Sequence, residues 1–156
     1  MPIQSSPLIE VKHTRNKGRG VFAREFIPQG TVIERAPVLV IPSEQVLESE
    51  THNVIQDYVF HWGRGTVALA LGFGSMYNHS YQPNARYDDV GRLTKIFTAL
   101  QDIEAGQEIT VNYNGDENDD TPVWFDIADD TEPAPRRART NKQTATQNPA
   151  ERKSAV

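Results

Sequence analysis

Residues 72–84 read Gly-Phe-Gly-Ser-Met-Tyr-Asn-His-Ser-Tyr-Gln-Pro-Asn, and this stretch limits the structure and chemistry of the chain more than any other. A histidine between an asparagine and a serine suggests a metal ligand or a member of a catalytic triad. No carboxylate or second histidine lies at ligand spacing from His79, and the chain has no cysteine, so no metal site is expected. Alone, Asn78 is better explained by an Asx-turn beside a hydrogen-bonded histidine.

Two further segments carry chemistry when they are taken together with this one. Near the amino end, residues 17–23 read Lys-Gly-Arg-Gly-Val-Phe-Ala, and glycines let the backbone approach a ligand closely. Residues 105–113 read Ala-Gly-Gln-Glu-Ile-Thr-Val-Asn-Tyr, a turn and a strand that end in a tyrosine. Each segment alone favours an ordinary explanation, a hairpin for the first and a packed tyrosine for the second. The order and spacing of all three segments together are not explained in this way.

In this order, the three segments resemble the signature motifs of the SET-domain family of protein lysine methyltransferases. The resemblance runs from about Leu8 to Phe125 and includes residues 30–34 and an aromatic segment at 122–125. It implies a mainly β fold of small sheets, the β-clip fold, with few short helices. It also implies a pseudoknot, in which the Asn-His-Ser segment crosses the segment that ends in Tyr113, a rare exception to unthreaded topology.

The resemblance also implies a cofactor, S-adenosylmethionine, and roles for particular residues. Tyr113 is the expected catalytic residue. The expected cofactor-binding residues are Lys17, Arg19, Gly20, Phe22, Asn78, His79 and Trp124, of which Trp124 would stack on the adenine. The expected residues of the substrate channel are Tyr58, Met76, Tyr77 and Phe125.

Two departures from the family pattern affect what can be carried over. Many relatives read Asn-His-Ser-Cys where this chain has Tyr81, and the missing cysteines exclude the zinc modules that often flank the domain. Closing the substrate channel is therefore left to the acidic segment and to Trp124 and Phe125. The substrate specificity of relatives is not carried over.

The chemistry of lysine methylation sets a requirement on the site. A free lysine ammonium, with a pKa of ~10.4, cannot attack a methyl group, and an apolar channel near a sulfonium charge favours the neutral amine. Tyr113 is expected to orient the amine, and carbonyls of residues 76–78 to contact the methyl hydrogens. The rival from another class is a non-catalytic module that binds a peptide or partner. A small-molecule or nucleic-acid methyltransferase is disfavoured, because no glycine-rich loop joins a strand to a helix.

The length and composition predict one folded domain with a tail. The chain has 156 residues, of which 37% are hydrophobic. We expect a flexible amino terminus at 1–7, the SET domain at 8–128 and a disordered tail at 129–156, which is rich in Pro, Ala, Thr and Gln. β-rich runs separated by turn residues predict strands near 8–11, 21–23, 31–36, 38–41, 66–71, 86–88, 93–99 and 108–111, and a short helix at 43–48.

The charge of the chain changes sign towards its end. The net charge is -5, which argues against direct nucleic-acid binding by the folded body. Eight acidic residues and no basic ones lie in 116–132, and basic residues follow from 136 onward. The acidic block is either a solvated loop or a docking surface for a basic substrate. No signal peptide or membrane span is recognised, so a soluble, intracellular protein is expected.

The tail contains a stretch that itself resembles a methylation substrate. Residues 138–145 read Ala-Arg-Thr-Asn-Lys-Gln-Thr-Ala, which differs by the inserted Asn141 from the start of a histone tail, ARTKQTA. Arg152, Lys153 and Ser154 repeat the context of a second methylated lysine in that tail. Chance similarity in a basic extension is one explanation. The other is that Lys142 or Lys153 acts as an intramolecular substrate or pseudosubstrate.

Overall fold

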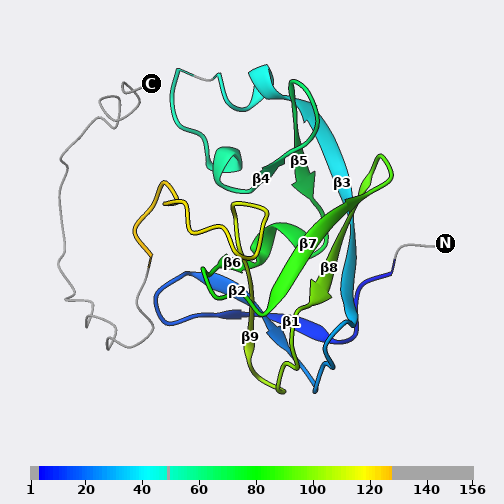
Figure 1. The fold of residues 1–156 in the computed structure, drawn as a ribbon. Helices are drawn as coiled ribbons and strands as arrows, with labels where there is room; N and C mark the ends of the chain where they lie inside the picture. Colours follow the sequence, from blue (N-terminus) through cyan, green and yellow to red (C-terminus); the bar gives the residue numbers. More distant parts are fainter. Residues whose placement is uncertain (1–3, 49, 128–156) are drawn as a thin grey trace.

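The computed structural model describes residues 4–48 and 50–127, and its strands form two small sheets (Figure 1). The five-stranded sheet has the order β4-β5-β3-β8-β7, built from β3 (Val32–Pro42), β4 (Val59–His61), β5 (Thr66–Ala70), β7 (Ala85–Val90) and β8 (Thr94–Ala99). The four-stranded sheet has the order β1-β2-β9-β6, built from β1 (Ile9–His13), β2 (Arg19–Ala23), β6 (Asn78–His79) and β9 (Glu108–Val111).

Helical structure in the described residues is limited to three short 3-10 segments. They are η1 (Ser43–Gln45), η2 (Val54–Asp57) and η3 (Gly74–Met76). The prediction of a mainly β fold with few short helices is therefore confirmed. None of the helices in the described part of the chain is long and apolar enough to cross a membrane.

One hydrophobic core lies between the sheets and receives side chains from both. Strand β8 alternates, with Lys95, Phe97 and Ala99 buried and the residues between them partly exposed. Strands β2 and β9 contribute Val21, Ile109 and Val111, which are fully buried. An isolated bridge between Ile27 and Ile103 closes the core near the turn before β9.

The pairing of β6 with β9 brings the Asn-His-Ser segment beside the strand that leads to Tyr113. The two strands are parallel, with Asn78 opposite Thr110 and His79 opposite Val111. Asn84 holds this arrangement, because its side chain accepts from the Thr110 N–H at 2.9 Å and donates to the Glu108 carbonyl at 2.8 Å. This adjacency is the one that the expected pseudoknot requires.

The two strands predicted at 31–36 and 38–41 form the single strand β3. Residues Val32 to Pro37 pair with β8, and residues Val38 to Pro42 pair with β5. Pro37, which has no N–H to donate, lies where the strand changes partner. A proline at this position does not interrupt the strand.

The helix predicted at 43–48 is wrong in length, because only Ser43–Gln45 is helical. The carbonyl of Val46 accepts hydrogen bonds from the side chains of Asn53 and Gln56, at 3.0 and 2.7 Å. These bonds tie the chain to η2, and no side chain caps η1. The predicted tail, 129–156, lies outside the described residues, as do residues 1–3 of the predicted flexible terminus.

Candidate active site

Two pockets meet at Tyr113. The first, here called the aromatic pocket, has a volume of about 510 Å³ and is lined by residues that include Tyr58, Phe60, Tyr77 and Tyr87. The second, the polar pocket, has a volume of about 490 Å³ and is lined by Asn16, Lys17, Asp57, Asn78, His79, Tyr113, Trp124, Phe125, Asp126 and Ile127. Tyr113, Trp124 and Asp57 line both. A group bound in one pocket therefore comes close to a group bound in the other.

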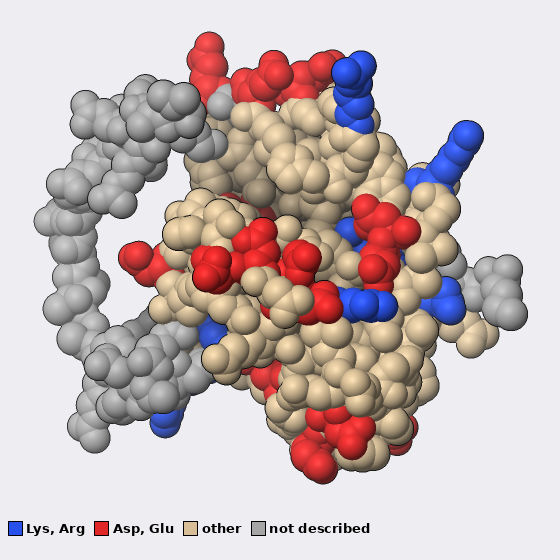
Figure 2. All heavy atoms as spheres, in the orientation of Figure 1, with Lys and Arg blue, Asp and Glu red and all other residues tan. Residues whose placement is uncertain are grey.

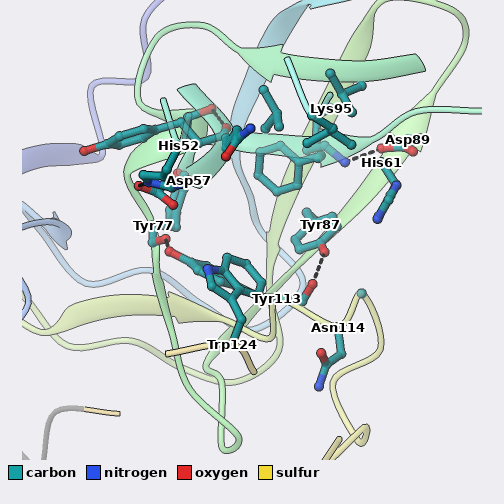
Figure 3. Close-up of a pocket in the computed structure, with 18 residues that line it drawn as sticks. His52, Asp57, His61, Tyr77, Tyr87, Asp89, Lys95, Tyr113, Asn114 and Trp124 are labelled. Atoms are coloured by element: carbon teal, nitrogen blue, oxygen red, sulfur yellow. Dashed lines mark hydrogen bonds and ion pairs between the residues drawn. The ribbon is translucent and has the colours of Figure 1, made fainter. Parts of the chain in front are cut away.

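Three hydrogen bonds fix Tyr113 between the pockets. Its hydroxyl donates to the Tyr77 carbonyl at 2.7 Å (Figure 3), and its backbone N–H donates to Nδ1 of His79 at 3.0 Å. Its carbonyl accepts from the Tyr87 hydroxyl at 3.3 Å. The partners lie in the segment before β6, in β6 itself and in β7, so three parts of the chain hold the backbone and the hydroxyl of this one residue.

The Tyr113 hydroxyl stays protonated at neutral pH. Burial, together with smaller electrostatic effects of the nearby Tyr58, Tyr87 and Glu108, raises the pKa of Tyr113 to about 12. A phenol with this pKa is a poor general base near pH 7. Because its proton is used in the bond to Tyr77, the oxygen lone pairs remain to accept hydrogen bonds and orient a neighbouring group.

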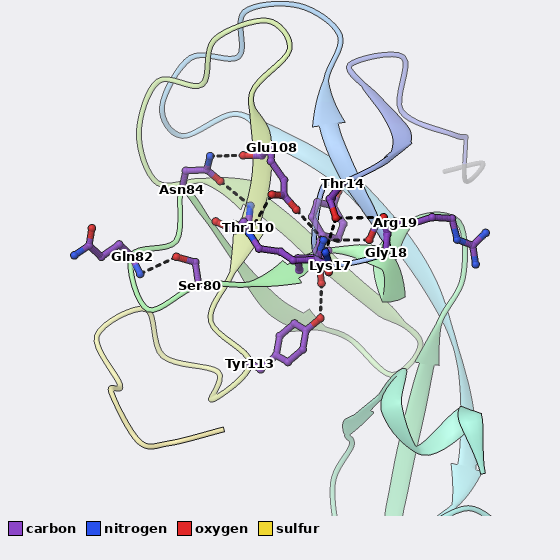
Figure 4. A network of polar contacts seen from close by, with 12 residues as sticks. Thr14, Lys17, Gly18, Arg19, Ser80, Gln82, Asn84, Glu108, Thr110 and Tyr113 are labelled. Atoms are coloured by element: carbon purple, nitrogen blue, oxygen red, sulfur yellow. Dashed lines mark hydrogen bonds and ion pairs between the residues drawn. The ribbon is translucent and has the colours of Figure 1, made fainter. Parts of the chain in front are cut away.

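A carboxylate, Glu108, organises the polar pocket (Figure 4). It accepts from Asn78 Nδ2 at 2.8 Å and pairs with Lys17 Nζ at 3.3 Å. Asn78 Nδ2 also donates to the Arg19 carbonyl at 3.1 Å. Gly20 leaves room for this contact, because a Cβ there would lie 2.6 Å from Glu108 Oε1 and 2.8 Å from Asn78 Nδ2. The glycine thus permits a close approach of side chains to β2.

His79 presents an unsatisfied donor. Because its Nδ1 accepts from the Tyr113 N–H, a neutral ring must carry its proton on Nε2. The ring is 5% exposed, and burial lowers the pKa of His79, which favours the neutral form. Nε2 is buried and has no hydrogen-bond partner among the described residues. A buried donor without a partner on the wall of a pocket suits a ligand that brings an acceptor.

The segment that carries Trp124 and Phe125 forms an aromatic flap over Tyr113. Trp124 stacks on Tyr113 with a centroid distance of 6.1 Å, and Phe125 lies 5.9 Å from it at a steep angle. Tyr81 anchors this flap, since its hydroxyl donates to the Thr121 carbonyl and accepts from the Val123 N–H, both at 3.1 Å. The residue that departs from the Asn-His-Ser-Cys pattern therefore ties the flap to the segment after β6.

The structure brings most of the expected site residues to the two pockets. Of the expected cofactor-binding residues, Lys17, Asn78, His79 and Trp124 line the polar pocket, together with Phe125, which was expected in the substrate channel. Tyr58, Tyr77 and Tyr113 line the aromatic pocket. Four expected residues line neither of these pockets: Arg19, Gly20, Phe22 and Met76.

Gly20 lies against Glu108 and Asn78, and the other three residues have different surroundings. Arg19 is exposed and contributes its carbonyl to Asn78. The ring of Phe22 lies 5.8 Å from the Lys12 ammonium, and its backbone pairs with Glu108. Met76 packs against the hydrophobic core.

A buried carboxylate beside the site, Glu34, was not among the residues expected from the sequence. Its Oε1 accepts from the Phe73 N–H at 2.9 Å and its Oε2 from the Tyr77 hydroxyl at 3.0 Å. Burial raises the pKa of Glu34, and the two hydrogen bonds oppose this rise. Tyr77 also stacks on Phe97 at 4.2 Å, so the residue whose carbonyl receives the Tyr113 hydroxyl is held on both sides.

A buried lysine, Lys95, was also missed. Its ammonium lies 4.4 Å from the Phe60 ring centroid and 4.3 Å from that of Tyr87, and it pairs with Asp89 (Figure 3). Burial lowers the pKa of Lys95, and Asp89 opposes that effect. The only sequence signal was the position of this lysine in the predicted strand 93–99. It points inward there, where alternation predicts an apolar side chain.

The site combines a hydrogen-bonded tyrosine between two pockets with a paired Asn-His segment, in a fold of small sheets. The model of the SET domain family matches residues 18–114, and the chain belongs to this family. Within the described residues, no three His, Asp or Glu side chains are arranged to hold a metal ion.

Individual relatives agree with this assignment. The chain is 38% identical over 127 residues, 81% of its length and 82% of the relative's, to a histone-lysine N-methyltransferase of Schizosaccharomyces pombe described as H3 lysine-37 specific. It is 32% identical over 98 residues to the histone-lysine N-methyltransferase set9 of Aspergillus terreus, covering 62% of this chain and 16% of that protein. The crystal structure of a candidate histone methyltransferase of Plasmodium falciparum superposes with a TM-score of 0.57 at 30% identity, covering 71% of this chain and 95% of that one. The chain is thus a protein-lysine methyltransferase.

Proposed function

We propose that this chain transfers a methyl group from S-adenosylmethionine to a lysine of a histone, with Tyr113 as the catalytic residue. The observation that carries the proposal is the position of Tyr113, which is fixed at the junction of the polar and aromatic pockets. The histone substrate follows from the names of the relatives. The domain at 8–128 is the catalytic unit in this proposal.

The residues of the polar pocket fit the cofactor. S-adenosylmethionine supplies an electrophilic methyl group on a sulfonium, together with an amino acid end and an adenine. The buried Nε2–H of His79 offers a donor to an acceptor on the adenine. Lys17 contributes a cation for the carboxylate, while Asn78, whose side chain is held by Glu108, contributes a polar group for the amino end. Trp124 and Phe125 contribute aromatic faces at the rim.

The aromatic pocket fits a lysine side chain. Its walls include Tyr58, Phe60 and Tyr87, which can cover the apolar stem of a lysine. Aromatic faces also tolerate an ammonium group better than aliphatic side chains do. Partial desolvation lowers the pKa of an ammonium, so a bound lysine gives up its proton more easily than in water. The lone pairs of the Tyr113 hydroxyl accept a hydrogen bond from the neutral amine and set its direction. Alignment of this kind is worth several kcal/mol without any covalent intermediate.

Substitution Tyr113→Phe tests the proposal. The variant should fold and bind S-adenosylmethionine with nearly unchanged affinity, because the phenyl ring keeps its packing against Trp124 and His79. Its kcat on histone should fall by about a hundredfold, since the orienting oxygen is lost. Calorimetric affinity and melting temperature serve as internal controls. Near-normal turnover would remove Tyr113 from the mechanism, and failure of the unmodified chain to bind the cofactor would indicate a non-catalytic module.

A further inference from the structure

The chain beyond Ile127 starts at the rim of the site. Phe125, Asp126 and Ile127 all line the polar pocket, and Trp124, just before them, lines both pockets. Residues 128–156 therefore continue the chain from a residue that lines the polar pocket, beside the pocket proposed for the substrate lysine. Whatever lysines these residues carry are presented to the site at high local concentration.

We propose that Lys142 is a methyl acceptor for its own chain, with residues 136–143 entering the aromatic pocket as an intramolecular substrate. This inference rests on the proposed function, because it uses the same catalytic site. It adds a substrate and a modification site within the chain.

The length of the tether permits this entry. Lys142 follows Ile127 by 15 residues. A fully extended chain of that length spans ~50 Å, and a flexible one has a root-mean-square end-to-end distance of ~20 Å. The aromatic pocket is well within this reach, because Trp124, shortly before Ile127, is one of its wall residues. A short flexible tether gives an effective concentration in the ~mM range.

The basic segment is complementary in charge to the acidic groups beside the site, and Lys95, which also lines the aromatic pocket, is paired with Asp89. Residues 133–150 contain Arg136, Arg137, Arg139 and Lys142 and no acidic residue. Asp57 lines both pockets, and Asp126 lines the polar pocket. The aromatic pocket is also lined by Asn114 and Gly115, which lead directly into the acidic loop at 116–120, and acidic side chains gather across the middle of this face (Figure 2). A basic segment is attracted to this face, and an acidic one is repelled.

The same criteria favour Lys142 over Lys153. Lys153 follows Ile127 by 26 residues and lies two residues after Glu151. A longer tether lowers the effective concentration, and the nearby acidic residue reduces the attraction to an acidic rim. Lys153 is therefore the matched control for Lys142 in the same chain.

The chemical step is the one proposed for a substrate in trans. The Lys142 ammonium loses its proton to water, and the neutral amine nitrogen forms a bond to the methyl carbon. The carbon–sulfur bond breaks, and its electron pair stays on the sulfur, which becomes a neutral thioether. No oxidant, reductant or metal ion is needed.

Intact-mass and peptide analysis of the full chain after incubation with S-adenosylmethionine tests the modification. We expect one or more methyl groups on Lys142, none in Lys142→Arg, and full modification in Lys153→Arg. The fraction modified at a given time should not change over a roughly hundredfold dilution, since the reaction is intramolecular. A rate that falls in proportion to dilution, or methylation that persists in Lys142→Arg, overturns the proposal.

A second measurement needs neither cofactor nor turnover. A carbodiimide links a carboxylate and an amine only when they are in direct contact, so full-length chain is treated with it and the linked peptides are identified. We expect Lys142 linked to Asp57 or to the acidic loop at 116–120, fewer links from Lys153, and loss of the Lys142 links at high salt. Links from Lys142 no more frequent than those from Lys153 contradict the preferred docking.

The outcomes separate this proposal from the proposed function. If added histone is methylated while Lys142 is not, the enzyme assignment stands and the intramolecular substrate is wrong. If Lys142 is linked to Asp57 but never methylated, the segment binds without serving as a substrate, and the proposal is again wrong. If neither histone nor Lys142 is methylated, both proposals fail together.

Discussion

At the scale of single residues, His79 has two functions on its two ring nitrogens. Nδ1 accepts from the Tyr113 N–H, while Nε2 is buried and has no hydrogen-bond partner within residues 4–48 and 50–127. The amide oxygen of asparagine reaches about as far as Nδ1, and the amide nitrogen of glutamine about as far as Nε2. The two functions can therefore be separated by substitution.

Substitution His79→Asn should lower the affinity for S-adenosylmethionine by about tenfold, equivalent to ~1.4 kcal/mol, because the Nε2–H donor is lost. His79→Gln should keep more of the affinity but lower the kcat, because Tyr113 loses the acceptor for its N–H. Calorimetry and steady-state kinetics on both variants check this split. Equal cofactor affinity in His79→Asn and the unmodified chain would contradict the role of Nε2.

The buried ring of His79 also makes the stability depend on pH. Burial lowers the pKa of His79 from 6.5, so the unfolded chain binds a proton at higher pH than the folded chain does. The stabilising contribution of the neutral ring is therefore complete above about pH 6.5 and is lost as the pH falls through the lowered pKa. Urea unfolding between about pH 5 and 8 should show this loss, and His79→Asn, which does not titrate, should show less of it.

Glu34 should contribute to stability and to the placement of Tyr77. Substitution Glu34→Ala leaves the Tyr77 hydroxyl and the Phe73 N–H without their acceptor, which should reduce the free energy of unfolding by about 1–3 kcal/mol. Glu34→Gln keeps one acceptor oxygen and should lose less. Denaturant unfolding of both variants measures the difference, and equal losses would show that the hydrogen bonds of Glu34 are not what stabilises the site.

Sequence patterns singled out Tyr113 but not the residues that position it. Tyr113, Asn78 and His79 occur in a recognisable order, so the resemblance identified them. Glu34 and Glu108 also lie in segments that resemble the family. However, Glu34 bonds Tyr77 and Glu108 pairs with Lys17, and both partners are distant in sequence. Only the folded chain shows which carboxylate meets which donor.

At the scale of elements, the flap that carries Trp124 and Phe125 is held by few contacts. The Tyr81 hydroxyl supplies two hydrogen bonds to it, and Asn114 supplies another to the Thr121 carbonyl at 2.7 Å. Trp124 itself is 69% exposed. Opening of this segment should therefore cost little free energy compared with global unfolding.

Substitution Tyr81→Phe should release the flap without unfolding the domain. The phenyl ring keeps its edge contact with His79 at 4.5 Å, but the bonds to Thr121 and Val123 are lost. We expect faster hydrogen exchange at the Val123 amide and weaker cofactor binding by several-fold, with a melting temperature close to that of the unmodified chain. Unchanged exchange at Val123 would mean that other contacts hold the flap.

Elements of regular length were predictable, and the shortest ones were not. Strands β1, β2, β5, β7, β8 and β9 lie where alternation and turn residues placed them, with small differences at their ends. Strands β4 and β6 have three and two residues, too few for any period to be visible. β6 is a strand only because Asn78 and His79 pair with β9. This pairing joins segments that are distant in sequence, so no local pattern predicts it.

At the scale of the whole molecule, charge is the property that the sequence showed most directly. The net charge of -5 and the acidic block at 116–132 were visible without a structure. The position of acidic groups relative to the site was not visible. Asp57 belongs to η2, far from that block in sequence, and it lines both pockets. Folding places acidic groups from separate segments around one entrance.

Methylation of a basic histone peptide should therefore depend on salt through KM rather than kcat. Raising the ionic strength from about 0.05 to 0.5 M shortens the screening length from ~14 to ~4 Å, which weakens attraction between the peptide and the acidic face. In the proposed function the amine meets Tyr113 at the buried junction of the two pockets, where salt screens little, so kcat should change little. Asp57→Asn should raise KM at low salt and reduce its salt dependence, whereas Asp102→Asn, on the turn before β9 and outside both pockets, should leave KM unchanged. A salt effect confined to kcat, or equal effects of the two substitutions, would show that acidic groups at the entrance do not select the substrate.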